Sequence, residues 1–227
     1  MDRVVISIGG SVLVPGDGDH AYIADLARLL SDLSKEFRIF AVTGGGKVSR
    51  FYIETGRALG AKERRLDELG IEITRMNARL LGIALRGKSN LEPARTYTEA
   101  TRLTRRYDIV VMAGTAPGWT TDRVAASLAR TVGAARLVNA TSVDGVYSAD
   151  PKVDRTARRF ETMTYAQLVD LTGKGHDRAG PAIVFDPVGA SVVARARIPL
   201  LVVDGRDLAE LRKAIAGERF HGTTVMG

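Results

Sequence analysis

The chain of 227 residues contains no cysteine, only three histidines, and aromatic residues at 6% of its positions. The absence of cysteine excludes thiolate zinc sites, iron–sulfur clusters and thiol catalysis, and it fits a reducing cytosol. The histidines His20, His176 and His221 are far apart and lack ligand spacing, so neither a metal cluster nor a Ser-His-Asp triad is expected. Because aromatic residues are scarce, few stacking platforms exist for nucleic acid, and we expect no nucleic-acid partner.

The chain also lacks a long hydrophobic run. No apolar segment approaches the roughly 20 residues of a membrane span, and the run at residues 4–8 is too short for a signal peptide core. We therefore expect no membrane association and a cytoplasmic location.

Lysine and arginine outnumber aspartate and glutamate by 33 to 26, a net charge of +7 that admits an anionic partner such as a phosphorylated small molecule.

Short apolar runs alternate with amphipathic helical patterns along the chain. Apolar runs typical of buried strands occupy residues 4–8, 38–42, 109–112, 137–139 and 198–203. Apolar residues at helical spacing lie around residues 23–33, 47–59, 73–84, 124–132 and 208–215. Strands that alternate with crossover helices form parallel sheets with helices on both faces. The sequence therefore predicts an α/β fold, a three-layer αβα sandwich with a mostly parallel central sheet.

We expect one domain over residues 1–227, because the chain has neither a Pro/Ser-rich linker nor a repeat of 20–50 residues. A boundary between two lobes, 1–133 and 134–227, is expected near Gly133, where a predicted crossover helix ends and a strand begins. Ligands of such sheets bind beyond the carboxyl ends of the strands. The glycine-rich turns of this chain lie at those ends.

Three glycine-rich turns follow predicted strands and are candidates for binding phosphate. They are Gly9-Gly10-Ser11, Gly44-Gly45-Gly46-Lys47 and the run GTAPGWTTD at residues 114–122. Glycine lets backbone N–H groups approach a phosphate closely, and two of the turns open a helix with a positive N-terminus. Any one of them is also explained as a tight turn, but three at one sheet edge favour a phosphate site. Lys47 and Arg50, one helical turn apart, are either phosphate-binding cations or solvated helix residues.

Other polar side chains are ambiguous without structural context. The acidic candidates are Asp67, Asp122, Asp144, Asp150 and Asp186. Aspartate is most often a cap or turn residue, and Asp122, in the first turn of a predicted helix, fits that interpretation best. Trp119 is either a base-stacking residue or an anchor of its loop.

One formal Walker A match, GIALRGKS at residues 82–89, is rejected. A P-loop must follow a strand and open a helix, so that backbone N–H groups and the helix dipole meet the phosphates. Here the segment before Gly82 is helical in pattern, and Pro93 follows Ser89 within four residues. We expect Gly87 to end a helix instead.

Taken together, these turns and the segments between them resemble the amino-acid kinase family and, within it, the archaeal-type uridylate (UMP) kinases. The resemblance runs over nearly the full chain. The segments that carry it are residues 8–15, 44–47, 73–78, 114–122, 143–151, 172–175 and 222–224. Its most specific part is VDGVYSADP at residues 143–151, in sequence with the GT…TTD turn.

The resemblance implies phosphoryl transfer from Mg-ATP to UMP in pyrimidine nucleotide biosynthesis, with Mg²⁺ as the cofactor. It implies that residues 1–133 bind UMP and residues 134–227 bind ATP. The residues it assigns to ATP are Gly9, Gly10, Ser11, Gly45, Arg50, Thr141, Tyr147 and Asp150. The residues it assigns to UMP are Gly44, Asp67, Gly114, Thr115, Ala116, Pro117, Gly118, Trp119 and Thr120. Asp67 is expected on the ribose hydroxyls.

Phosphoryl transfer requires two phosphates held in line and their charge neutralised, rather than a nucleophilic side chain. Many relatives carry a lysine in strand one where this chain has Ser7, so the corresponding cation is unassigned. Lys47 and Lys174 are the candidates for stabilising the transition state, with Arg178 in reserve. Asp186 is expected to orient them or to act through Mg²⁺.

The resemblance also implies a homohexamer built from dimers, and the apolar residues around Met76 and Leu80 exceed what one buried stripe requires. Three alternatives remain open. Isopentenyl phosphate kinases share the fold but carry a histidine just after the triple glycine, where this chain has Lys47, Val48 and Ser49. A metal-oxyanion storage protein and a nucleotide-sensing regulatory subunit, both non-catalytic, are the other two.

Overall fold

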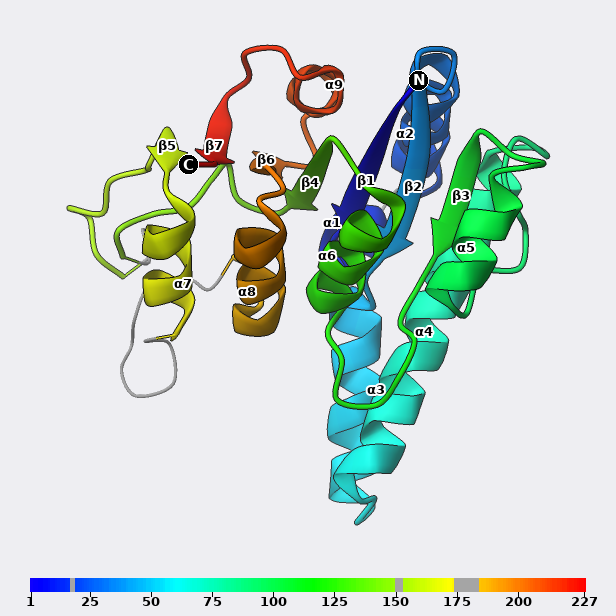
Figure 1. The fold of residues 1–227 in the computed structure, drawn as a ribbon. Coiled ribbons are helices and arrows are strands. Elements are labelled where there is room, and N and C mark those ends of the chain that lie inside the picture. The colour runs from blue at the N-terminus through cyan, green and yellow to red at the C-terminus, as the bar shows by residue number, and fades with distance from the viewer. Residues whose placement is uncertain (17–18, 150–152, 174–183) are drawn as a thin grey trace.

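A computed structural model describes residues 1–16, 19–149, 153–173 and 184–227, which form one seven-stranded sheet between two layers of helices (Figure 1). The strands are β1 (Asp2–Ile8), β2 (Phe37–Thr43), β3 (Ile109–Met112), β4 (Arg136–Thr141), β5 (Thr162–Met163), β6 (Leu200–Asp204) and β7 (Gly222–Val225). Their order is β3-β2-β1-β4-β6-β7-β5, and each neighbouring pair is parallel except β6 with β7. The predicted αβα sandwich with a mostly parallel sheet is confirmed.

The helices follow the strands as crossover connections. They are α1 (Gly10–Leu13), α2 (Asp19–Leu33), α3 (Gly46–Ala58), α4 (Glu63–Ala84), α5 (Tyr97–Leu103), α6 (Thr121–Val132), α7 (Tyr165–Gly173), α8 (Pro187–Ala196) and α9 (Leu208–Ala216). No helix among these described residues combines the length and the hydropathy of a membrane span. The sheet is continuous across the expected lobe boundary, because β4 pairs with β1 in the register Val5↔Leu137.

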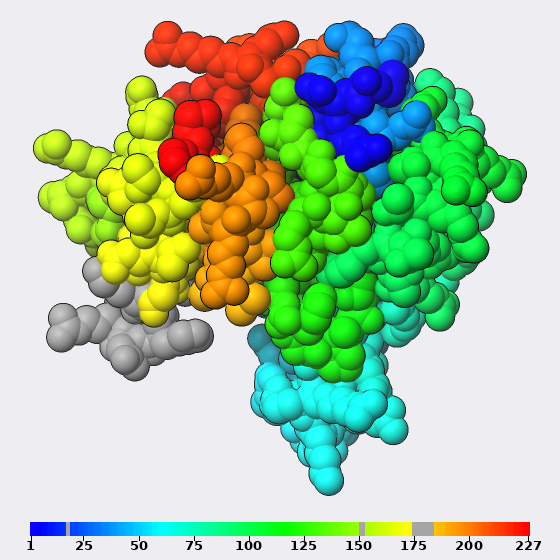
Figure 2. All heavy atoms as spheres, viewed as in Figure 1, coloured from blue at the N-terminus to red at the C-terminus, as the bar shows by residue number. Residues whose placement is uncertain are grey.

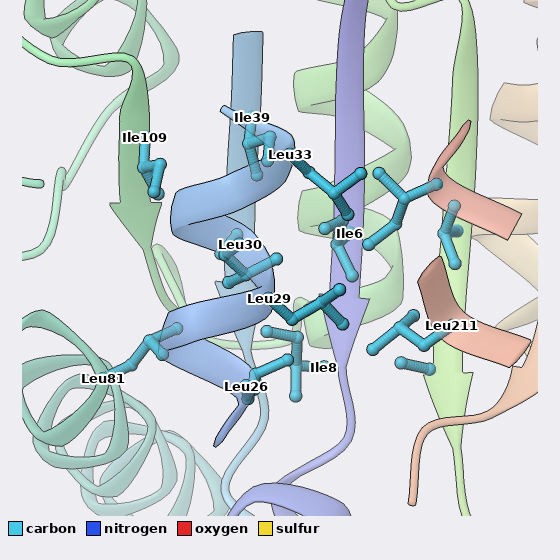
Figure 3. Close-up of a cluster of buried hydrophobic side chains, with 14 of the residues drawn as sticks. Ile6, Ile8, Leu26, Leu29, Leu30, Leu33, Ile39, Leu81, Ile109 and Leu211 are labelled. Atoms are coloured by element: carbon cyan, nitrogen blue, oxygen red, sulfur yellow. The ribbon is translucent and has the colours of Figure 1, made fainter. Parts of the chain in front are cut away.

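Both faces of the central strands are buried, which explains their unbroken apolar runs. Helices α2, α4 and α9 cover one face, where Leu26, Leu30 and Leu33 of α2 pack on Ile6 and Ile8 of β1 (Figure 3). Helices α5, α6, α7 and α8 cover the other face. Each of these fully buried leucine or isoleucine side chains contributes roughly 1.5–3 kcal/mol to folding.

The structure adds elements that the apolar pattern did not predict. These are the helices α1, α5, α7 and α8 and the strands β7 and β5, of which β5 is at the edge of the sheet. Strand β5 has only two residues, and β7 has the sequence GTTV, so neither carries an apolar run. Helix α4 begins at Glu63, ten residues before the predicted start, because its first half packs on α3 and extends with it past the carboxyl ends of β1 and β2 (Figure 1).

The rejection of the Walker A match is confirmed. Gly82 lies inside α4, where an added Cβ would stand 3.2 Å from the Asn90 carbonyl oxygen. The helix ends at Ala84, and the chain reverses through two residues with positive φ, Arg86 at 48° and Gly87 at 85°. Helix termination, not phosphate binding, therefore accounts for Gly87.

Candidate active site

The first two glycine turns pack backbone against backbone. A Cβ on Gly10 would lie 2.2 Å from the Gly46 nitrogen and 2.6 Å from the Gly44 carbonyl oxygen. Gly46 has a φ of +64°, and its own Cβ would lie 2.4 Å from the Gly10 carbonyl carbon. Only glycine fits at these two positions, so the turns after β1 and β2 form one backbone surface.

That surface lines a cavity of about 320 Å³ at the carboxyl ends of β1, β2 and β4, which we call the strand-end cavity. Its lining residues are Ser7, Gly9, Gly10, Ser11, Val12, Gly44, Gly45, Gly46, Arg50, Thr121, Asp122, Asn139, Thr141, Ser142 and Val184. Arg50 is the only cation in this described lining, and its Nη2 atom donates to Ser11 Oγ at 3.2 Å. Lys47 lies outside the lining, with Nζ 3.5 Å from the Pro15 carbonyl oxygen.

Asp122 is a half-buried carboxylate in the wall of this cavity. Ser7 Oγ donates to Asp122 Oδ1 at 3.0 Å. Burial raises the pKa of Asp122 to about 6, and the nearby Asp186 carboxylate adds to the increase. The interpretation of Asp122 as a helix cap is wrong, because Thr120 caps α6 by accepting from the Arg123 N–H, and the Asp122 carboxylate binds Ser7 instead.

Asp186 occupies the N-cap position of α8 and accepts a hydrogen bond from the Gly189 N–H at 2.7 Å. Its side chain is therefore fixed by its own helix. Two helices, α6 and α8, thus begin close to one another with a carboxylate each, and the charge of one acts on the other.

A second cavity, of about 470 Å³, lies between α3, α4 and the turn after β3, and we call it the turn cavity. Its lining residues are Gly45, Ser49, Ile53, Asp67, Gly70, Ile71, Thr74, Gly114, Ala116, Gly118, Trp119, Thr120 and Thr121. Asp67 Oδ2 accepts a hydrogen bond from the Gly118 N–H at 2.8 Å, so helix α4 holds the turn in place. The Arg123 guanidinium stacks on the Trp119 ring with its carbon 3.8 Å from the ring centroid.

Buried polar residues of α4 hold two of the glycine turns, the one after β2 and the one after β3. Thr74 Oγ1 accepts from the Gly114 N–H at 2.9 Å, and Asn77 Nδ2 donates to the Gly44 carbonyl oxygen at 2.8 Å. The apolar pattern alone does not identify these roles. The signal that could have found them is polar residues on the buried stripe of an amphipathic helix, where each must have a partner.

The structure brings most of the predicted site residues to the two cavities. Of the residues assigned to ATP, the strand-end cavity is lined by Gly9, Gly10, Ser11, Gly45, Arg50 and Thr141. Of the residues assigned to UMP, the turn cavity is lined by Asp67, Gly114, Ala116, Gly118, Trp119 and Thr120. Thr115 and Pro117 are in neither lining, and Gly44 lines the strand-end cavity. Asp150, Lys174 and Arg178 lie outside the described residues.

The two cavities meet, because Gly45 and Thr121 line both of them. Gly45 is the N-cap residue of α3, and Thr121 is the first residue of α6. Helix N-termini present free N–H groups and a positive partial charge. The junction of the cavities therefore suits negatively charged groups that enter from both sides.

Tyr147 lies apart from both cavities, on the loop between β4 and β5. Its hydroxyl donates to Asp144 Oδ1 at 2.8 Å, while Asp144 Oδ2 lies 3.0 Å from Nε2 of His221 and 3.8 Å from Nε of Arg159. Burial by itself would raise the pKa of Asp144, but the hydrogen bonds from Tyr147 and His221 and the charge of Arg159 lower it. Burial and the Asp144 carboxylate raise the pKa of Tyr147.

Comparison with known proteins adds to this geometry. The amino acid kinase family model matches residues 2–204 of the chain. The chain is 47% identical over 225 residues to a uridylate kinase of Methanoculleus marisnigri, covering 99% of this chain and 96% of that protein. The crystal structure of uridylate kinase from Archaeoglobus fulgidus is similar with a TM-score of 0.89 and 38% identity, covering 99% of this chain and all of that one. A UMP kinase structure from Bacillus anthracis, 20% identical with a TM-score of 0.81, shares the fold.

Proposed function

The chain belongs to the amino acid kinase family, and on this premise we propose that it is a uridylate kinase, which transfers the γ-phosphoryl group of Mg-ATP to UMP and releases UDP and ADP. The observation that carries this proposal is the junction of the two cavities at Gly45 and Thr121. Phosphoryl transfer depends on positioning, and two cavities that share a wall allow donor and acceptor phosphates to approach each other in line.

We assign the strand-end cavity to the ATP phosphates and the turn cavity to UMP. The packed glycines Gly10 and Gly46 present backbone to the donor, and Arg50 supplies a positive charge at the same cavity. Asp67 is a poor phosphate ligand, since two anions repel, but it is a good acceptor for a ribose diol. Its link to the Gly118 N–H supports this role, because it joins the carboxylate to the turn that would enclose the nucleotide.

We propose that Mg²⁺ enters with the nucleotide and that Asp122 is the carboxylate that would hold it. Residues 1–16, 19–149, 153–173 and 184–227 contain no cluster of three or more His, Cys, Asp or Glu side chains that could hold a metal ion by themselves. Burial and the neighbouring Asp186 carboxylate raise the pKa of Asp122, so an added cation would stabilise its charged form. Mg²⁺ commonly binds one or two carboxylates together with phosphates. Asp122 would hold the ion beside the phosphates, where Mg²⁺ would supply positive charge that offsets theirs.

We further propose a homohexamer that functions in the cytoplasm in pyrimidine nucleotide biosynthesis. Support for association comes from large apolar side chains exposed along α3 and α4, among them Phe51, Leu59, Met76 and Ile83. The end of α3 and the beginning of α4 project from the body of the molecule (Figure 2). A projection with exposed apolar side chains is typical of a surface that contacts another protein.

The test is a turnover assay with ATP and Mg²⁺ and, in separate reactions, UMP, CMP, AMP and isopentenyl phosphate. We expect the fastest turnover with UMP. Faster turnover of another acceptor would contradict the assignment of UMP as the substrate. Nucleotide binding without turnover of any acceptor would instead support a regulatory subunit, and neither binding nor turnover would leave a storage protein.

A further inference from the structure

The loop that carries Tyr147 is attached to the beginning of β7, almost 80 residues later in the chain. His221 Nε2 lies 3.0 Å from Asp144 Oδ2, and Tyr147 uses the other oxygen of the same carboxylate at 2.8 Å. The single carboxylate of Asp144 therefore joins the side chain of Tyr147 to the side chain of His221. With one partner on each oxygen, the carboxylate is held in one orientation.

Two further contacts attach the same loop to the same strand. The Val146 N–H donates to Thr223 Oγ1 at 2.9 Å, and Thr223 is fully buried. Gly145 lies so close to β7 that a Cβ there would stand 2.7 Å from Thr223 Oγ1. Backbone and side-chain contacts thus fix three consecutive loop positions, 144 to 146, directly before Tyr147.

Arg159 contacts the same group of residues but does not make a hydrogen bond to Asp144 as His221 does. Its Nη1 donates to the Gly222 carbonyl oxygen, and its Nη2 lies 3.4 Å from His221 Nδ1. Its Nε is 3.8 Å from Asp144 Oδ2, which is too long for a hydrogen bond. If His221 were removed, Asp144 Oδ2 would lose its shortest side-chain contact and keep only the longer ion pair with Arg159, so the carboxylate would be held less firmly toward Tyr147.

We propose that His221 and Thr223, at the beginning of β7, position Tyr147 for the donor nucleotide, with His221 acting through Asp144. This inference rests on the proposed function and on the assignment of Tyr147 to ATP that the resemblance implies. Because Tyr147 lies outside the cavity assigned to the ATP phosphates, its contact would be with the nucleoside. His221 is a positioning residue, since it contacts the loop and not the reacting phosphates. It therefore controls the affinity for ATP and leaves UMP binding and the transfer step unchanged.

The experiment compares His221→Ala, His221→Gln and the control His20→Ala in the full chain. Glutamine can donate to Asp144 from a similar distance, whereas alanine cannot. His20 is an exposed histidine near the start of α2 and serves as a matched substitution elsewhere. For each variant, KM for ATP, KM for UMP and kcat are measured, together with the dissociation constant of ATP by calorimetry in the absence of UMP.

We expect His221→Ala to raise KM and the dissociation constant for ATP by about threefold to tenfold, as for a charge-assisted hydrogen bond that is partly open to solvent. The kcat value, KM for UMP and the thermal midpoint should stay near those of the wild type, and His221→Gln should restore most of the ATP affinity. Thr223→Ser, which keeps the hydroxyl, should bind ATP more tightly than Thr223→Val.

An unchanged ATP affinity in His221→Ala would overturn the inference, and so would an equal loss of ATP and UMP affinity. The two proposals fail in different ways. If the wild type binds ATP but does not phosphorylate UMP, the proposed substrate is wrong, and the calorimetric comparison still decides the role of His221. If the wild type phosphorylates UMP and His221→Ala binds ATP normally, only the role of His221 is wrong. A wild type that does not bind ATP contradicts both.

Discussion

At the scale of single residues, environment separates carboxylates that look alike in the sequence. Asp67 and Asp122 both adjoin the turn after β3, yet Asp67 accepts from a backbone N–H in the turn cavity and Asp122 lies in the wall of the strand-end cavity. Burial raises the pKa of Asp122 to about 6, because it opposes the charge of the carboxylate. The two residues therefore call for different tests.

The Asp67→Asn substitution should weaken UMP binding by roughly 10-fold to 100-fold, because a charge-assisted hydrogen bond contributes about 1.5–3 kcal/mol. The asparagine oxygen can still accept from the Gly118 N–H, so the turn should keep its shape. ATP affinity should barely change. Calorimetric titration of each nucleotide checks this, with Glu68→Gln as the control, because Glu68 is the adjacent carboxylate and pairs with Arg64 and Arg65. An unchanged UMP affinity would remove Asp67 from the acceptor site.

The Asp122→Asn substitution should stabilise the protein in a pH-dependent way. The folded state holds the Asp122 proton up to about pH 6, whereas the group ordinarily ionises near 3.8. The wild type therefore loses stability as the pH rises through this window, because the unfolded chain releases the proton first. Asparagine has no charge to bury and should raise the free energy of unfolding by about 2 kcal/mol at pH 7.5.

Urea unfolding at pH 4, 5, 6 and 7.5 measures this effect. The difference between Asp122→Asn and the wild type should shrink toward zero at pH 4, where both side chains are neutral in the folded state. A difference that stays constant from pH 4 to 7.5 would contradict burial as the cause. Turnover at pH 7.5 should fall in the variant, since the proposed Mg²⁺ ligand loses the charge that the wild-type carboxylate carries above its pKa of about 6.

At the scale of elements, the site depends on how closely two turns approach each other. The turns after β1 and β2 meet at Gly10 and Gly46, whose backbones leave no room for a side-chain carbon. Neighbouring parallel strands carry the two turns to the same sheet edge, since Ile8 pairs with Thr43. The backbone surface that faces the phosphates is therefore a product of strand pairing and of glycine together.

Gly10→Ala should cost several kcal/mol of stability or abolish turnover, because its Cβ would meet three backbone atoms within 2.6 Å. Gly173→Ala is the matched control. Gly173 ends α7, and a Cβ there would meet nothing within 4 Å, so alanine should be neutral or slightly stabilising. Denaturant unfolding of both variants, together with turnover of Gly10→Ala, provides the measurement. Equal behaviour of the two variants would show that the turns can separate at little cost.

At the scale of the whole molecule, the end of α3 and the beginning of α4 project from the body (Figure 2). Several large apolar side chains on or next to these helices are exposed in the described chain. Leu59 is 82% exposed and Ile83 is 63% exposed, values unlike those of the core leucines and isoleucines. Exposed apolar area of this kind is stabilised when copies associate.

Light scattering of the wild type at micromolar concentration should give the mass of a hexamer. The double substitution Met76→Glu with Ile83→Glu should shift the mass to smaller species, since burying two added charges in an interface is unfavourable. Val153→Glu, at a residue 76% exposed outside α3 and α4, should not change the mass. A monomeric wild type would exclude the hexamer.

The sequence by itself determined the fold class and the central strands, because parallel strands buried on both faces must be continuous apolar runs. The run at residues 4–8 lies within β1, and that at 109–112 is β3. The three glycine turns were also evident, since glycine placed directly after a strand is a local signal. The sequence did not reveal which side chains near these turns line a cavity. Lys47 lies outside both linings, whereas Arg50, three residues later, lines the strand-end cavity.

Only the tertiary structure decided the contacts that join distant parts of the chain. Ser7 meets Asp122, and Asp144 meets His221, across 115 and 77 positions of sequence. Strand β7 has no apolar run, and its place between β6 and the edge strand β5 follows from pairing rather than from its own composition. The physical reason is the same in each case: a pKa, a hydrogen-bond partner or a strand's place in the sheet depends on which elements lie side by side, and local sequence patterns carry no information on that.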